Sequence, residues 1–209
     1  MSVQVQRKIT PDEYLVMERE ADFRSEYYNG EIFAMAGASR KHNLVCGNVF
    51  AAIHRQFRNR SCEVYTGDMR VRVSETGLYT YPDVLAVCEP PRFDDEEKDT
   101  LLNPTLIIEV LSKSTESYDR GEKFAHYRTI GSLKEYILIS QNWFRIEHYM
   151  RQSGSQWMLS EFSDPEDTVE LPSVGCSLKL SEVYDKVEFS QKAVESIVSY
   201  SGKAGILRQ

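Results

Sequence analysis

The chain has 209 residues, of which 41% are hydrophobic and 27% are charged, values close to those of ordinary globular proteins. This composition excludes wholesale disorder and fibrous structure, and the length predicts one domain with short extensions. Twenty-five basic residues against 32 acidic residues give a net charge of −7, which excludes a protein that coats nucleic acid through bulk positive charge but not an enzyme with an acidic site.

The N-terminal part of the chain predicts a helix, a hairpin and a second helix. Thr10 is a helix cap followed by proline and two acids, so a helix is expected over residues 11–21. Asn29-Gly30 is typical of the two-residue turn of a hairpin over residues 26–35. Ser39 caps the second helix, whose apolar residues recur at helical spacing and form one core face: Cys46, Val49, Phe50, Ile53 and Phe57.

The middle of the chain predicts strands around one almost wholly apolar segment. One or two strands are expected in residues 62–73 and another in 79–88, followed by a polar, acidic loop over 89–103. Residues 106–111 read LIIEVL, a pattern typical of a central strand covered on both faces.

The C-terminal half predicts a helix over residues 116–130, ending at Gly131, and then a β-meander. The meander strands are expected at residues 136–140, 143–151 and 156–162. This order of elements favours an α/β (mixed α+β) fold, in which a central mixed sheet is flanked by helices. We expect a single domain over residues 1–189 and a tail or short helix over 190–209.

No segment or cysteine motif indicates a membrane or a structural metal. No apolar run approaches the roughly 18 residues of a membrane span, and the N-terminus shows no apolar signal region, so we expect a cytoplasmic protein. The four cysteines form no CxxC motif, and Cys46 lies four residues after His42 without a matching second pair. We therefore expect all four cysteines to be reduced, and no structural zinc.

Two acidic residues stand in or beside apolar strands. Glu109 lies inside LIIEVL, where a lone carboxylate is costly unless it is paired, protonated or bound to a metal. Asp83 opens the strand VLAV and shares a face with Leu85, as Glu109 does with Ile107. A buried ion pair for Glu109 and a turn role for Asp83 stay open. Two carboxylates at neighbouring strand ends nevertheless suit a hard cation such as Mg²⁺.

Lys123 is the third candidate, on the helix that follows the Glu109 strand. Asp119, Lys123 and Tyr127 repeat every four residues and therefore share one helix face. The same spacing is found in ordinary surface ion pairs. Because a helix after a central strand packs back near the end of that strand, we expect the Lys123 ammonium to point toward Glu109 and Asp83.

Glu31 and His42 are further candidates with simpler alternatives. Glu31 lies just past the hairpin turn and can add a metal ligand through water, or be a surface charge. His42 lies near the start of the second helix and can contact a phosphate or a ligand carboxylate, or be a capping histidine. No Gly-x-Ser-x-Gly elbow is present, so the serines after Glu109 are interpreted as a helix cap.

Five short motifs follow one another between about residues 11 and 187. They are Asn29-Gly30-Glu31-Ile, Ser39-x-x-His42, Pro82-Asp83-Val84, Glu109-Val-Leu-Ser-x-Ser-Thr115 and Asp119-Arg-x-x-Lys123-x-x-x-Tyr127. Their order and spacing resemble the PD-(D/E)XK restriction-endonuclease-like superfamily and, within it, the Uma-type putative restriction endonuclease family of bacteria.

The resemblance implies a restriction-endonuclease-like core with a Mg²⁺ site at the edge of a central mixed sheet. Asp83 matches the aspartate of the pattern, and Glu109 matches the acid of its second half. The pattern expects a lysine two residues later, where this chain has Leu111. Lys123 is the candidate that restores the missing charge from the neighbouring helix.

The function implied is Mg²⁺-dependent hydrolysis of DNA phosphodiester bonds, with Mn²⁺ as a substitute. Asp83 and Glu109 would hold the metal, and together with Lys123, Glu31 and His42 they form the expected catalytic set. We expect no membrane partner.

A two-fold homodimer is also expected, because cleavage of both DNA strands needs two active sites. Aromatic residues that crowd the meander are a second reason, although a core role for them is equally open: Trp143, Phe144, Tyr149 and Trp157.

Two other functions stay open. The missing strand lysine and the acidic net charge favour a binding or regulatory module that kept a nuclease fold without turnover, in which Lys123 would point away from both acids. A metal-dependent hydrolase of small phosphoesters would instead need a closed pocket. A nuclease needs a positively lined groove beside Asp83 and Glu109.

Overall fold

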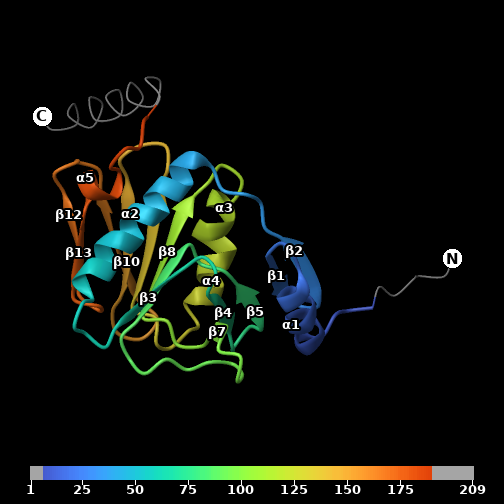
Figure 1. Cartoon of the computed structure of the whole chain (residues 1–209). Coiled ribbons are helices and arrows are strands. Elements are labelled where there is room, and N and C mark those ends of the chain that lie inside the picture. Colours follow the sequence, from blue (N-terminus) through green and yellow to red (C-terminus); the bar gives the residue numbers. More distant parts are fainter. Residues whose placement is uncertain (1–6, 190–209) are drawn as a thin grey trace, which may run out of the picture.

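A six-stranded mixed sheet lies at the centre of the computed structural model, which describes residues 7–189 (Figure 1). Its strands are β3 (Glu63–Thr66), β6 (Val84–Val87), β8 (Leu106–Leu111), β9 (Glu135–Ser140), β10 (Ile146–Arg151) and β11 (Trp157–Phe162). They are ordered β11-β10-β9-β8-β6-β3. β8 and β9 are parallel and the other neighbours antiparallel, which confirms the predicted mixed sheet.

Apolar side chains cover β8 on both faces, as its sequence predicts. Ile108 and Val110 face a core shared with α2 (Arg40–Gln56). The same core is closed by a small hairpin and helix: β12 (Thr168–Leu171), β13 (Cys176–Lys179) and α5 (Leu180–Val183). Ile107 and Leu111 face the opposite core, under the helical segment that follows β8. All six residues of β8 are buried, Glu109 included.

A second, five-stranded sheet carries the N-terminal hairpin. Its strands are β1 (Ser25–Tyr28), β2 (Glu31–Ala34), β4 (Arg70–Val73), β5 (Leu78–Thr80) and β7 (Thr100–Leu101). Asn29 and Gly30 both have positive φ, as the predicted tight turn requires. Helix α1 (Pro11–Glu20) begins with the capping box of Thr10 and Glu13 and packs on β1 through Tyr14 and Tyr27.

The helix predicted for residues 116–130 is shorter and irregular. It consists of α3 (Glu116–Tyr118), the π-helical turn η1 (Asp119–Lys123) and α4 (Phe124–Tyr127). A π-turn adds one residue to the helical repeat, and such turns are frequent at functional sites. Here Asp119 and Lys123 are both buried within it.

The other differences from the predicted elements have local causes. The strand predicted for residues 79–88 splits into β5 and β6, which belong to different sheets, because Pro82 has no N–H for a ladder. The acidic loop contains β7. The strand expected from residue 143 begins at Ile146. Strands β12 and β13 were not predicted.

The prediction that all four cysteines are reduced is wrong for two of them. Cys62 and Cys88 form a disulfide, whereas Cys46 and Cys176 are free. The antiparallel register pairs Glu63 of β3 with Val87 of β6. Cys62, just before β3, therefore faces Cys88, just after β6. This proximity is created by strand pairing and has no local motif.

Three of the four meander aromatics are partly buried against the two cores, so they give no separate support to a dimer. Tyr149 and Trp157 pack against Phe124, and Phe144 packs against Tyr184. The homodimer therefore stays a prediction. The tail expected over residues 190–209 lies outside the described residues. Every helix between residues 7 and 189 is too short or too polar to cross a membrane.

Candidate active site

Asp83 and Glu109 meet where β6 begins and β8 ends. The antiparallel register pairs Val84 with Ile108, which places the two acids opposite one another on the same sheet face. The Asp83 backbone N–H donates to Glu109 Oε2 at 3.3 Å, and the Val110 N–H donates to Asp83 Oδ2 at 2.7 Å. The two carboxyl groups thus lie at the shared strand ends that the sequence predicts.

Lys123 points into this pair from η1. Its Nζ lies 3.0 Å from Glu109 Oε1, and the two side chains are only 6% and 4% exposed. The Tyr127 hydroxyl donates to the same oxygen at 2.9 Å, one turn further along the helical segment. The Lys123 ammonium therefore contacts Glu109, as expected, from the helical segment and not from the strand, where Leu111 stands at the position of the expected lysine.

Glu26 of β1 is a member of the site that the sequence did not reveal. Its Oε1 lies 3.2 Å from Lys123 Nζ and accepts a hydrogen bond from the Thr80 hydroxyl, and Tyr118 lies near its other oxygen. Glu26 lies in a short, polar strand, SEYY, where an acid is unremarkable. Its role depends on Lys123, far away in the sequence, and no local pattern signals that contact.

Glu31 does not join this group. It lies on β2 opposite Tyr28 and is exposed, and among residues 7–189 it forms no ion pair or hydrogen bond with Lys123, Asp83 or Glu109. A ligand role for Glu31 through water therefore stays a prediction. The same hairpin supplies an acid to the site, but from its other strand.

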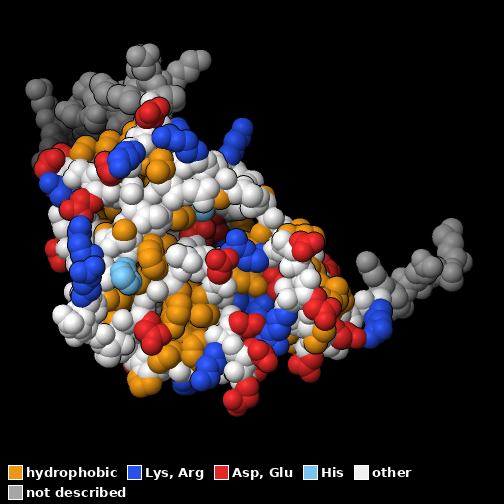
Figure 2. All heavy atoms as spheres, in the orientation of Figure 1, with side chains coloured by type: hydrophobic (Ala, Val, Ile, Leu, Met, Phe, Trp, Pro, Cys, Tyr) orange, Lys and Arg blue, Asp and Glu red, His pale blue; other side chains and the backbone are white. Residues whose placement is uncertain are grey.

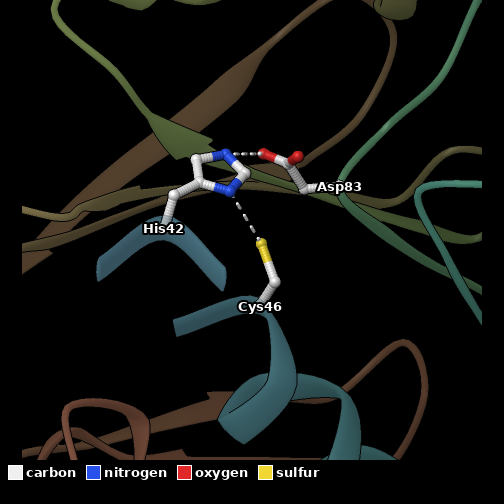
Figure 3. Close-up of side chains that lie close together, drawn as sticks. All are labelled: His42, Cys46 and Asp83. Carbon is white, nitrogen blue, oxygen red and sulfur yellow. Dashed lines mark hydrogen bonds and ion pairs between the residues drawn. The ribbon is translucent and has the colours of Figure 1, made fainter. Parts of the chain in front are cut away.

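His42 reaches Asp83 from the first turn of α2 (Figure 3). The Ser39 hydroxyl caps this turn by accepting from the His42 backbone N–H at 3.1 Å. The His42 ring places Nε2 3.1 Å from Asp83 Oδ2 and Nδ1 3.4 Å from the sulfur of Cys46. His42 therefore contacts the carboxylate of Asp83, which the sequence predicts to be a metal ligand.

Three carboxylates lie within 4 Å of the Lys123 ammonium, those of Glu26, Glu109 and Asp119, and Asp83 lies next to Glu109. We call these four acids the carboxylate cluster. Burial, reinforced by Asp119 and Asp83 and opposed by Lys123, raises the pKa of Glu109 to about 8. Burial also raises the pKa of Asp119. For Lys123, burial lowers the pKa, but the surrounding acids outweigh it and raise the pKa above its usual value. The cluster therefore holds excess negative charge that a proton or a cation relieves.

The neighbouring histidine and thiol respond to the same charges. Burial alone lowers the pKa of His42, but the hydrogen bond and the charge of Asp83 outweigh it, so the pKa is raised. Burial, followed by the charges of Asp83 and Glu109, raises the pKa of the Cys46 thiol. Cys46 is therefore a poor candidate for a nucleophile activated by His42.

The carboxylate cluster fits a hard divalent cation. Asp83 and Glu109 offer carboxylate oxygens, the ligand type that Mg²⁺ prefers, and the surrounding acids leave negative charge uncompensated. The Asp83 side chain is 22% exposed, so an ion and a substrate can reach it from solvent. Glu109 would present Oε2, because Oε1 is held by Lys123 and Tyr127.

The surface around the site carries both signs of charge. Figure 2 shows acidic side chains in a hollow between α2 and the segment of α3, with basic side chains beside it. Arg40 and Lys113 are exposed, just before His42 and just after β8, and pair with no carboxylate of residues 7–189. Two cavities, of about 440 and 540 Å³, lie elsewhere and contain none of the site residues in their linings.

Comparison with known proteins agrees with this fold. The sequence profile of the Uma2 family, described as "Putative restriction endonuclease", matches residues 11–181. The chain is 39% identical over 170 residues to the uncharacterized protein sll1609 of Synechocystis sp., covering 81% of this chain and 96% of that protein. It is 32% identical over 182 residues to the uncharacterized protein slr1290 of the same organism, covering 87% and 94%.

A solved structure has the same fold. The crystal structure of a putative nuclease belonging to DUF820 from Anabaena variabilis superposes with a TM-score of 0.70 at 21% identity. The superposition covers 86% of this chain and 99% of that one. The restriction-endonuclease-like architecture predicted from the sequence motifs is therefore confirmed.

Proposed function

The chain belongs to the Uma2 family of putative restriction endonucleases, and from this premise we propose that it is a Mg²⁺-dependent nuclease that hydrolyses phosphodiester bonds of DNA. Nucleases with the restriction-endonuclease-like fold generally use a divalent metal. One observation carries the proposal: Lys123 Nζ lies 3.0 Å from Glu109, beside Asp83, although the strand itself lacks the expected lysine.

Each residue of the site has its own role in this proposal. Asp83 and Glu109 would hold the metal, which when bound polarises the scissile phosphate and lowers the pKa of a bound water. Lys123 neutralises part of the cluster, and its ammonium would stabilise negative charge that develops on the phosphate. Tyr127 fixes one oxygen of Glu109, and His42 fixes one oxygen of Asp83. Glu26 holds the ammonium of Lys123 in place.

DNA as the substrate is supported by the open, partly exposed position of Asp83 and by basic residues near it. A duplex or single strand needs access from the surface, whereas a small phosphoester needs an enclosed pocket. Arg40 and Lys113 can contact backbone phosphates on either side of Asp83 and His42, which would position the strand without reading its sequence.

The direct test is the conversion of supercoiled plasmid to nicked and linear forms with Mg²⁺ or Mn²⁺. We expect cleavage by the wild type, its loss with chelator, and a decrease of roughly 100-fold or more in Asp83→Asn. Glu122→Gln is the matched control, because Glu122 is an exposed acid next to Lys123. Equal cleavage by Asp83→Asn and wild type at equal purity would rule out this site.

A module without turnover is the second candidate. The net charge of −7 and the near-complete burial of Lys123 favour it, since a buried ammonium bound by Glu26 and Glu109 also serves as a purely structural ion pair. The inward direction of Lys123 favours the enzyme. A gel shift with DNA that persists in Asp83→Asn, combined with no cleavage by any preparation, would decide for the module.

A further inference from the structure

His42, Cys46 and Asp83 bring a nitrogen, a sulfur and an oxygen donor to one place. His42 and Cys46 are four residues apart and share one face of α2, and Asp83 approaches from the start of β6 (Figure 3). One donor atom from each lies within 4.8 Å of the other two. All three residues are only partly buried, so solvent ions have access to them.

We propose that these three residues form a binding site for a borderline divalent ion such as Zn²⁺, distinct in ligand type from the oxygen site of Asp83 and Glu109. Thiolate and imidazole ligands select zinc over magnesium, which prefers oxygen. Three protein ligands and one open position are typical of zinc sites that still exchange a ligand.

The observed spacing is close to what such an ion needs. Tetrahedral zinc with bonds of about 2.0–2.3 Å holds its ligand atoms roughly 3.3–3.7 Å apart. His42 Nε2 and Asp83 Oδ2 are 3.1 Å apart, and Cys46 Sγ is 3.4 Å from the other ring nitrogen. Donors that lie within 4.8 Å of one another therefore differ from zinc spacing by about 1 Å, which rotation of the side chains can supply.

The charge of the surroundings favours a cation over a thiol nucleophile. Asp83 and Glu109 place negative charge near Cys46, which opposes an unpaired thiolate. A divalent ion supplies the missing positive charge and takes the thiolate as a ligand, with the thiol proton released to solvent.

The site shares Asp83 with the proposed catalytic metal. If the proposed function holds, Zn²⁺ bound here withdraws Asp83 from Mg²⁺ and inhibits cleavage, a consequence that rests on that function. Binding itself does not depend on it, because the Co²⁺ titration described below is read without DNA or Mg²⁺. The binding test can therefore succeed or fail independently of nuclease activity.

The test is a titration of metal-free protein with Co²⁺ as a spectroscopic probe for zinc, without strong reductant so that the Cys62–Cys88 disulfide stays closed. We expect one Co²⁺ per chain, a thiolate-to-cobalt charge-transfer band in the near ultraviolet, and displacement of the band by Zn²⁺ but not by Mg²⁺. Cys46→Ser should lose the band, and His42→Gln should weaken binding at least tenfold.

Cys176→Ser is the matched control, because Cys176 is the other free cysteine and its sulfur contacts Arg60, past the opposite end of α2 from His42. It should keep the band. The absence of a band in folded wild type would overturn the proposal, and so would a band that persists in Cys46→Ser or disappears only in Cys176→Ser. Should Cys46→Ser fail to fold, unchanged affinity in His42→Gln is the outcome that overturns it.

Discussion

The two oxygens of Glu109 face different surroundings. Oε1 lies 3.0 Å from the Lys123 ammonium and accepts from the Tyr127 hydroxyl, and Oε2 accepts from the Asp83 backbone N–H. Oε2, the oxygen next to Asp83, therefore accepts the weaker hydrogen bond and lies nearer to a second acid. A cation at this point would satisfy both carboxylates at once and, together with the Lys123 ammonium, would offset the cost of an acid in an apolar strand.

Metal binding through Glu109 should stabilise the fold. In thermal melts, Mg²⁺ at a hundredfold excess over its Kd should raise the free energy of unfolding of the wild type by about 2.7 kcal/mol. Glu109→Gln should show no such gain, because the neutral amide is a poor Mg²⁺ ligand. Glu122→Gln, an exposed acid in the same region, should keep the gain. An equal shift in all three proteins would place the ion elsewhere.

Removal of the Lys123 ammonium should destabilise the protein as well as affect turnover. Lys123→Met leaves Glu109, Glu26 and Asp119 without their common partner, and breaking a buried pair in this way typically costs about 3–5 kcal/mol. The double variant Lys123→Met/Glu109→Gln should recover part of this loss. Urea melts of the two variants measure the difference, and no recovery in the double variant would contradict the assigned pairing.

The sequence predicts those site residues that stand out in their local sequence. Glu109 is visible because it interrupts an apolar strand, and Lys123 because its spacing from Tyr127 follows the helical repeat. The sequence does not single out Glu26, since it is one acid of a polar hairpin and only its tertiary pairing with Lys123 distinguishes it. Cys62 and Cys88 were missed for the same reason.

At the scale of elements, the π-helical turn explains how an ordinary helical spacing becomes a buried site. Residues 119–123 follow β8 after a short turn and α3, and the wider turn buries Asp119 and Lys123 on the side of Glu109. The sequence predicts the helix and its direction but not this irregularity, because nothing in Asp119-Arg-Gly-Glu-Lys123 distinguishes a π-turn from an α-turn. Strands β12 and β13 escaped prediction because their apolar runs are short.

The acidic loop before β8 is tied to α1 by ion pairs. Arg19 of α1 contacts Asp95 and Asp99, and Arg70 of β4 contacts Asp99 at 3.0 Å. The hydrogen bond from Arg19, which outweighs partial burial, and the charge of Arg70 hold the pKa of Asp99 well below its usual value. This loop thus fixes the N-terminal helix to the second sheet.

Asp99→Asn should therefore destabilise the protein by about 1 kcal/mol at neutral pH, a modest amount because Asp99 is 35% exposed. A carboxyl group whose pKa is lower in the folded state than in the unfolded state stabilises the fold at pH values above its unfolded pKa, which is about 4. This stabilisation is lost as the pH falls below that value. The difference in the free energy of unfolding between the wild type and Asp99→Asn should thus become smaller below about pH 4. Glu96→Gln, an exposed acid in the same loop, should show no such pH-dependent difference. Denaturant melts across pH would reveal a constant gap if the pairing were absent.

At the scale of the whole molecule, a net charge of −7 has to be reconciled with the proposed binding of DNA. The conflict is resolved if a few basic residues near the site make the phosphate contacts while the other charges lie elsewhere. Arg40 at the start of α2 is one such residue. Arg58 is equally exposed but lies just past the other end of the same helix, roughly 25 Å away at 1.5 Å per residue.

Arg40→Glu should weaken DNA binding several-fold and reduce its salt dependence, because a phosphate contact is replaced by a repulsive charge. Arg58→Glu changes the net charge equally and should leave affinity nearly unchanged. Fluorescence anisotropy with labelled duplex at several salt concentrations measures both. Equal loss in the two variants would mean that binding follows overall charge, and the proposed location of the DNA would then be wrong.

The most direct test of the metal site is an anomalous difference map from crystals soaked in Mn²⁺. If Asp83 and Glu109 hold the metal, the map should show a peak roughly 2.2 Å from carboxylate oxygens of both residues, close to the bond lengths of hard divalent ions. Crystals of Asp83→Asn soaked in the same way should lack it. A well-diffracting wild-type crystal with no peak between these two residues would contradict the central claim and leave Glu109 as a structural partner of Lys123.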